Sequence, residues 1–239
     1  MTSSSSNSAN VDVVEQIWSD LVKTDNNNVE EGNNASLEHH LKSGWTTDQA
    51  SQRREKDGSF NVVQPPIDCP AWLCIILPCI TKIPSMKAFA QLKPDDAEVL
   101  RNNGKWIRYD ASSLVSGDVI RLEEGDMVPA DCVVVDTSED LLLVDLQAVT
   151  GQERPKSIAA TASGSTLSKG QRQLYLGGRV VQGRATALVT SVGPQTLLAT
   201  LIQDGRFPPK EPVLEASMDM SASASSGGRG GGGDVQLGT

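Results

Sequence analysis

The residues best suited to chemistry lie in one short stretch, VDLQAVTGQERP, at positions 144–155. An apolar run there breaks at the turn 150–153, which carries an amide, Gln152, beside a carboxylate, Glu153, and Arg154 follows. A carboxylate can take a proton as a general base, whereas an amide can only orient a water through its oxygen. The turn therefore predicts either a catalytic loop or a polar surface turn, and the surrounding elements must decide between them.

Taken alone, this turn has an ordinary structural interpretation. Thr150-Gly151 suits a tight turn, Pro155 would stiffen its exit, and the polar side chains would face water. Lys156 and Arg172 add positive charge in the same part of the sequence. We expect these cations to form a solvated face rather than a phosphate clamp.

The cysteines resemble neither a disulfide framework nor a metal site. Cys69, Cys74 and Cys79 repeat at five-residue spacing in an apolar stretch, and Cys132 stands alone. Zinc sites need closely spaced cysteine or histidine ligands, and the two histidines, at 39–40, lie far upstream. We therefore expect no metal, no other cofactor and a reducing compartment.

The most hydrophobic segment spans residues 65–84, with an uninterrupted apolar run at 71–80 that includes Trp72. A membrane-spanning helix needs roughly 20 apolar residues, and Pro78 interrupts this run, so we expect it not to cross a bilayer. Three outcomes stay open: burial against the domain, contact with lipid headgroups, or anchoring by acylation of the cysteines within 69–79.

The charge and composition limit the partners and the organisation. A formal net charge of −9 opposes binding to nucleic acid, and the N-terminus has no signal-peptide pattern, which favours the cytoplasm. The oligomeric state is not indicated. Composition predicts disordered tails at 1–10 and 206–239, a helical unit at 11–58, an apolar connector at 59–93 and a β domain at 94–205.

The helical unit shows two separate signals. Apolar residues at three-and-four spacing over 11–23 predict an amphipathic helix. Within 36–58, Gly44 ends one short helix, and Thr46 with Gln49 forms a capping box for the next, which should stop at the final glycine. We expect this pair to pack on the β domain.

Downstream of residue 105, short runs of Val, Leu and Ile are separated by Gly, Asp and Asn turns. This texture predicts a mainly β fold with flanking helices, a sandwich or distorted jelly roll, and residues 194–203 predict a closing helix with proline in its first turn. Gly117 and Gly125 should adopt positive φ, with the aspartate after each bonding turn amides. The predicted strands are 106–109, 119–122, 131–136, 141–145, 178–181 and 184–192.

The run LVSGDVIRLEEGDMVPADCVVV, residues 114–135, resembles the actuator domain of P-type cation-transporting ATPases, whose pattern is Leu-Val-x-Gly-Asp-Ile/Val followed by Gly-Asp-x-Ile/Val-Pro-Ala-Asp. Residues 144–155 are similar to the loop of that family, and GGRVVQG, 177–183, to its Gly-Ser/Thr-x-Val-x-x-Gly hairpin. Residues 44–58 resemble the N-terminal unit of calcium and proton pumps. The resemblance to the actuator domain covers roughly residues 95–203, and it implies the jelly-roll fold of that domain.

The resemblance gives the loop a specific expected role. In active members the loop reads Thr-Gly-Glu-Ser, and its glutamate activates a water for attack on the aspartyl phosphate of a neighbouring domain. Here Gln152 takes the position of that glutamate and Glu153 that of the serine. Losing a positioned base costs about 10²- to 10⁴-fold in rate, and a one-residue shift at a strand end disfavours Glu153 as a substitute.

The departures from the family pattern shape the expected function. The phosphorylated motif Asp-Lys-Thr-Gly-Thr does not occur, and only the apolar stretch stands where the family has two membrane helices. We expect a catalytically inactive binding or regulatory module at the cytosolic face of a membrane. It would dock on a P-type ATPase or another membrane protein through Thr150, Gly151, Gln152, Glu153 and Arg154.

Two alternatives to this expectation remain. The chain could be a component or truncated relative of a cation pump that docks on a pump and influences dephosphorylation. It could instead be a membrane-surface structural protein that is anchored through residues 69–83, with Trp72 and the cysteines as the contacts.

Overall fold

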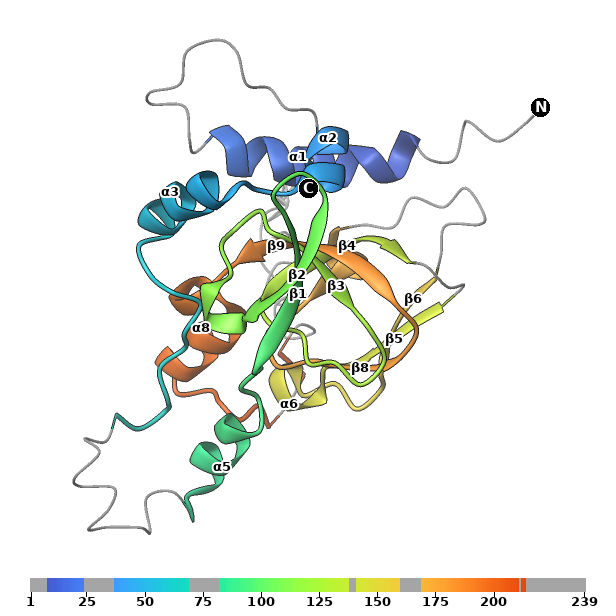
Figure 1. Cartoon of the computed structure of the whole chain (residues 1–239). Helices are drawn as coiled ribbons and strands as arrows, with labels where there is room; N and C mark the ends of the chain where they lie inside the picture. The colour runs from blue at the N-terminus through green and yellow to red at the C-terminus, as the bar shows by residue number, and fades with distance from the viewer. Residues whose placement is uncertain are drawn as a thin grey trace, which may run out of the picture.

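The structure, a computed structural model, describes residues 8–23, 37–68, 82–137, 141–159, 169–210 and 212–213. Two antiparallel sheets form its centre, and helices cover the outside of this β body (Figure 1). The predicted class, mainly β with flanking helices, is confirmed. Among the described residues, no helix is both long and apolar enough to cross a membrane.

The larger sheet has the strand order β2-β1-β3-β9-β4-β7, and the smaller sheet has the order β6-β5-β8. The strands of the larger sheet are β1 (Asp96–Arg101), β2 (Lys105–Asp110), β3 (Val119–Leu122), β4 (Asp131–Thr137), β7 (Gln173–Leu174) and β9 (Ala185–Ser191). Those of the smaller sheet are β5 (Leu141–Asp145), β6 (Lys156–Ala159) and β8 (Arg179–Gln182). The sequence patterns missed β1 and β6, because these segments mix charged and apolar residues, and they missed β7 because it is only two residues long.

The main core lies between the two sheets, as the alternation of side chains along a strand requires. Ile120 and Val134 of the larger sheet join Leu142 and Val144 of the smaller sheet in one buried cluster. Each of these four side chains is at most 2% exposed.

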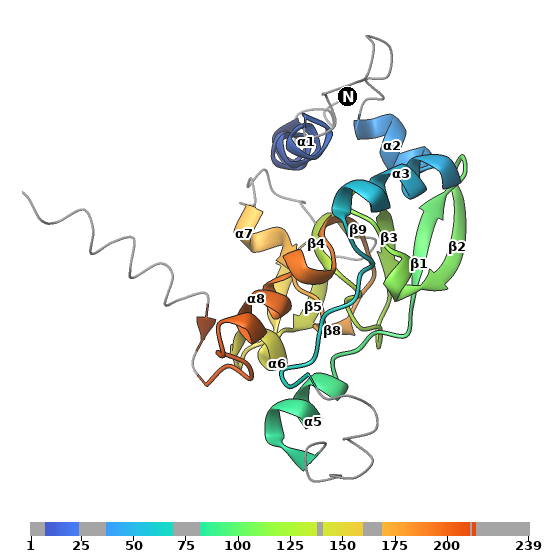
Figure 2. The ribbon, with the colours of Figure 1, turned by 90° about the vertical axis from the view of Figure 1, so that its left-hand side faces the viewer.

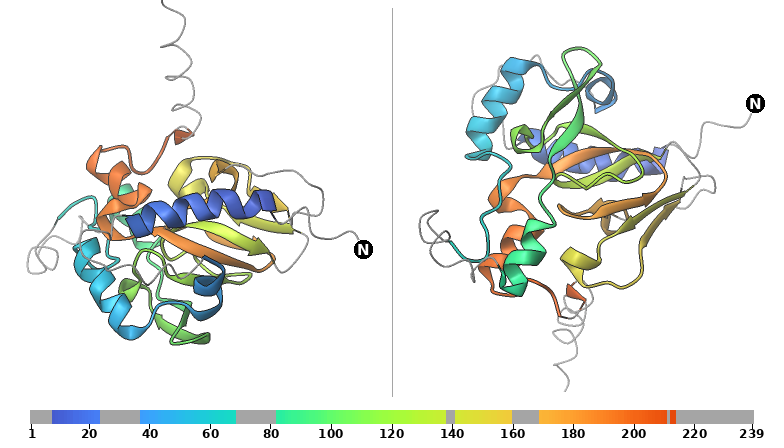
Figure 3. Two further views of the ribbon diagram at one scale, coloured as in Figure 1. Left: turned by 90° about the horizontal axis from the view of Figure 1, so that it is seen from above. Right: turned by 60° about the horizontal axis from the view of Figure 1, so that its bottom comes forward.

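The opposite face of the larger sheet is covered by α1 (Ser8–Lys23), which lies across the strands (Figure 3). Val119 and Val133 are both register partners of Leu188, so the three side chains form one row. This row belongs to the same apolar cluster as Trp18 of α1. Packing on this row explains why the amphipathic helix forms, since an isolated helix of this length is marginal in water.

Both predicted tails were assigned too generously. The helix α1 begins at Ser8, so residues 8–10 are helical, because a first helical turn needs no apolar residues of its own. At the other end, Phe207 and Val213 are buried against the domain. Composition marks the Gly/Ser-rich region but cannot show that two isolated apolar residues fold back onto the surface.

The helical pair consists of α2 (Leu37–Ser43) and α3 (Thr47–Asp57), as the sequence predicted. The capping box of Thr46 and Gln49 is present, and Gly58 ends α3 with a φ of 72°. The predicted closing helix starts later than expected. A 3₁₀ turn, Gly193–Gln195, takes up the proline, and α8 (Leu197–Gln203) begins only after Thr196, whose side chain caps it.

The α2–α3 pair holds the turn at residues 116–118, which connects to β3. The Nε atom of Arg53 donates to Ser116 Oγ over 2.7 Å, and the backbone N–H of Ser116 donates to Asp57 Oδ2 over 2.8 Å. The ring of Trp45 lies so close to Gly117 that a Cβ on Gly117 would meet it at 3.0 Å. This contact and a φ of 84° explain why glycine is required at position 117.

Predicted turn roles at two further positions are confirmed. Gly125 has a φ of 92°, and Asp126 accepts a hydrogen bond from the Glu123 N–H at 2.9 Å. Asp118 accepts one from the Val115 N–H at 2.9 Å. Asp118 also forms a buried ion pair with Arg101, with 2.6 Å between Oδ2 and Nη2, so the 116–118 turn is fixed from inside the sheet as well.

An aromatic stack joins α1, α2 and the 116–118 turn. His40 lies between Trp18 and Trp45, with ring centroids 4.1 and 4.4 Å away, and its Nε2–H donates to the Gly117 carbonyl over 2.8 Å. Burial lowers the pKa of His40 to about 4, with a smaller contribution from the nearby His39. The imidazole is therefore neutral at physiological pH.

A strap, residues 59–68, leads from α3 along the domain toward α5 (Pro84–Ala90) (Figure 2). The buried Asn61 side chain fixes this strap, donating to the carbonyls of Ala111 and Pro129 and accepting from the Gly193 N–H. A third apolar cluster then joins the strap, α5, α8 and the C-terminal turn. It contains Leu92, Val149, Leu176, Leu198, Leu201, Phe207 and Val213, with Val63 and Phe89 packed against it.

Candidate functional site

The candidate loop is positioned by α6 (Gln147–Thr150), a short helix that directly follows β5. Asp145, at the end of β5, accepts a hydrogen bond from the Gln147 N–H at 2.8 Å. Gly151 ends the helix with a φ of 76°, and its N–H donates to the Gln147 carbonyl over 2.9 Å. A left-handed glycine after a helix turns the chain sharply, so the residues that follow do not continue the helix.

Thr150 supports the loop from inside. It is fully buried, its Oγ1 donates to the Leu146 carbonyl over 3.0 Å, and the same oxygen accepts from the Gln152 N–H at 3.4 Å. The expectation that Thr150 belongs to the docking surface is therefore corrected. A threonine at a helix end can bond back to the carbonyl four residues earlier, and this bond turns the side chain inward.

The exposed part of the loop consists of Gln152, Glu153 and Arg154, which we call the 152–154 loop. Gln152 is half-buried, and the other two residues are exposed. Among the residues that the structure describes, none of these three side chains forms a hydrogen bond or an ion pair. An amide, a carboxylate and a guanidinium thus stand side by side, available to a partner.

The expectation that this loop continues a strand is wrong, because α6 intervenes between β5 and Gly151. The argument from strand alternation therefore cannot separate the roles of Gln152 and Glu153. Exposure separates them instead. Gln152 lies closer to the body of the domain, and Glu153 extends into solvent.

The two neighbouring cations are structural rather than solvated, which corrects another expectation. Arg172, at the end of α7 (Lys169–Arg172), is 4% exposed and donates to the carbonyls of Val134 and Val135. Lys156 Nζ donates to the carbonyls of Gly170 and Gln173 at 2.6 and 2.8 Å. Partial burial lowers the pKa of Lys156 to about 8. Of the cations near the loop, Arg154 is thus the one whose side chain has no hydrogen bond or ion pair among the described residues.

Asp131 is a buried anchor that the sequence showed only as the start of a strand. Its Oδ1 accepts from the Leu176 N–H at 2.9 Å, and its Oδ2 from the Leu197 N–H at 2.7 Å, which ties β4 to α8. Burial raises its pKa to about 6, although both hydrogen bonds oppose this shift. In the sequence, the Pro-Ala-Asp motif was the signal that could have marked Asp131 as an anchor. Its hydrogen-bond partners lie more than 40 residues away, so the sequence did not reveal them.

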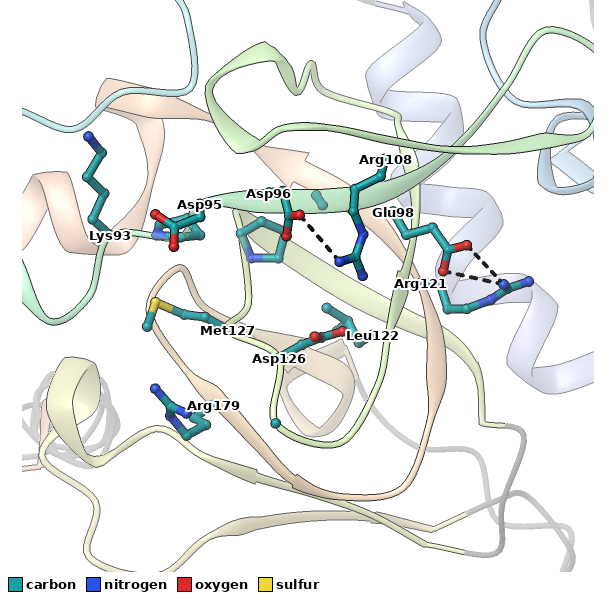
Figure 4. Close-up of a pocket in the computed structure, with 14 residues that line it drawn as sticks. Lys93, Asp95, Asp96, Glu98, Arg108, Arg121, Leu122, Asp126, Met127 and Arg179 are labelled. Atoms are coloured by element: carbon teal, nitrogen blue, oxygen red, sulfur yellow. Dashed lines mark hydrogen bonds and ion pairs between the residues drawn. The ribbon is translucent and has the colours of Figure 1, made fainter.

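A polar hollow of about 220 Å³ lies between β1, β2 and the β3–β4 loop (Figure 4). Two ion pairs border it, Asp96–Arg108 at 3.4 Å and Glu98–Arg121 at 3.3 Å. Its charges balance, which favours no ion of either sign. The charged lining residues are Lys93, Arg108, Arg121, Arg179, Asp95, Asp96, Glu98 and Asp126.

The remaining predicted sites cannot be placed in the same way. Cys69, Trp72, Cys74 and Cys79 lie outside the described residues. Cys132 is fully buried in the main core, and burial raises its pKa, which suits a core residue rather than a reactive thiol. Within the described part of the chain, no three or more His, Cys, Asp or Glu residues gather as a metal site.

Comparison with known families identifies the β body. Residues 91–205 match the family described as the P-type ATPase actuator domain. Residues 91–205 are a P-type ATPase actuator domain. The 152–154 loop, α6 and the 116–118 turn all lie within this actuator domain, whereas α1, α2 and α3 precede it.

Similar proteins include whole transporting ATPases. The sodium/potassium-transporting ATPase subunit alpha of Hydra vulgaris is 31% identical over 116 residues, which are 48% of this chain and 11% of that protein. The calcium-transporting ATPase 1 of Schizosaccharomyces pombe is 34% identical over 141 residues, 56% of this chain and 15% of that protein. A crystal structure of a zinc-transporting PIB-type ATPase in the E2.Pi state covers 58% of this chain and 21% of its own, with 24% identity and a TM-score of 0.39. The match thus spans only a small part of these relatives.

Proposed function

We propose that this actuator domain recognises a phosphorylated partner domain at the cytosolic face of a membrane without hydrolysing it. The observation that carries the proposal is the amide of Gln152 at the position where the resemblance to active pumps predicts a glutamate. The actuator fold around this position is intact, and the 152–154 loop keeps three side chains available for a partner.

The chemistry of the loop supports binding without turnover. Gln152 can orient a water or a phosphoryl oxygen but has no proton affinity suited to a general base. Glu153 carries a carboxylate, the kind of group that serves as a general base, yet it is exposed to solvent and contacts no described group that would fix its position. A base acts efficiently only when held within hydrogen-bond reach of the reacting water.

The chemistry of the partner follows from the same side chains. Arg154 offers charge-assisted hydrogen bonds to a phosphoryl group or an acidic surface, and Gln152 offers both an amide donor and an acceptor. The relatives named above are transporting ATPases, which makes a P-type ATPase the partner of first choice. The cytosolic face of a membrane follows from that choice.

The first test measures binding to a purified P-type cation-transporting ATPase with and without beryllium fluoride, a mimic of the phosphorylated aspartate. We expect capture by the full-length chain only with the mimic, weakened at least 10-fold by the double substitution Gln152→Ala/Arg154→Ala. Gln203→Ala, an exposed glutamine on α8, is the matched control and should bind as the wild type does. Capture that does not depend on the mimic would contradict the proposal.

The second test addresses turnover. The full-length chain should hydrolyse neither ATP nor acetyl phosphate above the blank, and it should not accelerate decay of the phosphorylated pump. Acceleration that is lost in Glu153→Gln would support the alternative in which the chain assists dephosphorylation, because the exposed carboxylate would then act as the base. Hydrolysis by the chain alone, abolished by Gln152→Ala, would show that the domain is an enzyme.

A further inference from the structure

The segment 82–93, KIPSMKAFAQLK, differs in charge from the rest of the molecule. It contains Lys82, Lys87 and Lys93 and no acidic residue, in a chain whose formal net charge is −9. All three lysines are exposed. Three exposed lysines in a segment of twelve residues without an acidic residue give this part of an acidic protein a local positive charge.

The helix at the centre of this segment, α5, buries none of its residues completely. Its inner side is anchored, because Ala88 and Phe89 pack against the third apolar cluster. Its outer stripe, Pro84, Lys87 and Gln91, is exposed at helical spacing. Within the part of the chain that the structure describes, the helix is thus anchored on one side and exposed on the other.

The position of α5 leaves its outer side accessible. Figures 1 and 2 both show α5 at the end of the molecule opposite α1 and α2. Ile83 and Met86 are partly exposed beside Lys87. Lysines next to apolar side chains at a protruding end combine the two properties that interfacial helices use: attraction to anionic headgroups and shallow insertion of apolar groups.

The acidic residues nearest in sequence do not cancel this charge. Asp95 and Asp96 follow Lys93, and Asp96 pairs with Arg108 on the neighbouring strand. Lys93 lines the polar hollow together with Asp95, whereas Lys82 and Lys87 do not. Among the described residues, Lys82 and Lys87 form no ion pair, so the uncompensated positive charge of the segment lies at these two positions.

We propose that Lys82, Ile83, Met86 and Lys87, called here the α5 surface, bind an anionic membrane surface. The lysines contact lipid phosphate or serine headgroups, and Ile83 and Met86 enter the boundary between the headgroups and the acyl chains. This binding would direct the α5 end of the actuator domain toward the membrane. The proposal deepens the proposed function by naming a lipid contact, and it requires no ATPase partner.

The experiment measures how much of the full-length chain sediments with lipid vesicles. One set of vesicles is made of phosphatidylcholine alone, and in the other about a third of the lipid is phosphatidylserine. We expect binding only to the vesicles that contain phosphatidylserine, and we expect it to weaken as salt rises. Each lysine near an anionic surface strengthens binding roughly 5-fold, so Lys82→Gln/Lys87→Gln should weaken it roughly 30-fold. Lys42→Gln/Lys105→Gln, two exposed lysines at the other end of the molecule, should change it less than about 3-fold.

Circular dichroism of both double-glutamine variants shows whether each retains its fold. A variant that does not fold is replaced by Lys82→Arg/Lys87→Arg, which keeps the positive charges. This arginine variant should bind the vesicles as the wild type does. Equal losses in the two double-glutamine variants would overturn the proposal, since the attraction would then be general. Binding to pure phosphatidylcholine that ignores salt would also overturn it. Gln152→Ala should bind vesicles normally, so a failure of the ATPase-binding test and a failure of the lipid test can be told apart.

Discussion

Two turns of this actuator domain use the same backbone device and have opposite surroundings. Gly117 in the 116–118 turn and Gly151 before the 152–154 loop both have positive φ, at 84° and 76°. The 116–118 turn is contacted by a buried ion pair and by four side chains of the α2–α3 region, His40, Trp45, Arg53 and Asp57. Among the described residues, the 152–154 loop has one such contact, the 3.4 Å hydrogen bond from the Gln152 N–H to Thr150 Oγ1.

This difference teaches that a left-handed glycine sets only the direction of the chain. Whether the turn becomes a rigid joint or an accessible surface depends on what the rest of the fold places around it. The 116–118 turn lies under the helical pair, whereas α6 directs the 152–154 loop away from the domain. We expect stability to depend strongly on the first turn and hardly at all on the second.

The largest effect should come from the ion pair behind the 116–118 turn. Asp118→Ala removes the partner of Arg101 and the acceptor for the Val115 N–H, so a buried guanidinium loses its counter-charge. We expect the free energy of unfolding in urea to fall by about 3–5 kcal/mol. Asp96→Ala, which removes an exposed pair with Arg108, should cost less than about 1 kcal/mol. Similar costs for both substitutions would mean that burial does not distinguish the pairs.

A smaller effect should appear as a pH dependence carried by His40. Because its folded pKa of about 4 lies below the ordinary value of 6.5, the unfolded chain binds a proton more readily between these values. Stability contributed by neutral His40 is complete above pH 6.5 and is lost as the pH falls toward 4. Asp131, with a raised pKa of about 6, works in the opposite direction over part of this range.

A comparison of two proteins separates these contributions. His40→Gln keeps a donor for the Gly117 carbonyl but cannot titrate, so the unfolding free energy of the wild type minus that of the variant isolates the histidine. We expect this difference to shrink by about 2 kcal/mol between pH 7 and pH 5. Urea unfolding of both proteins at the two pH values measures it, and a constant difference would show that His40 is not held neutral by the fold.

The smallest effect should come from the 152–154 loop. Gln152→Ala, Glu153→Ala and Arg154→Ala remove side chains without described contacts, so each should change the free energy of unfolding by less than about 0.5 kcal/mol. Thermal unfolding of the three variants beside Thr150→Ala gives the contrast, since Thr150 is buried and hydrogen-bonded to Leu146. A loop substitution that costs as much as Thr150→Ala would mean that the loop is part of the packed structure.

Much of the fold could be predicted because its signals are local. The strands β3 and β5 follow the predicted bounds, and the capping box at Thr46 and the glycine at 58 define α3. The strand β1, which lies between β2 and β3, was missed, since its alternation is interrupted by charged residues that pair across the sheet, as Glu98 does with Arg121. The packing of Phe207 and Val213 near the C-terminus was missed, because isolated apolar residues form no periodic pattern in the sequence.

The sequence by itself determined the family motifs, the glutamine at position 152 where active pumps have a glutamate, and the presence of glycines where the chain must turn. Only the tertiary structure decided which polar residues face solvent. Thr150 and Arg172 were expected at the surface and Asp131 only as the start of a strand. The structure buries all three, Thr150 against a carbonyl four residues away and the other two against distant backbone groups. The physical reason is that a buried polar side chain must find a hydrogen-bond partner, and the partners that the fold supplies can lie far away in the sequence.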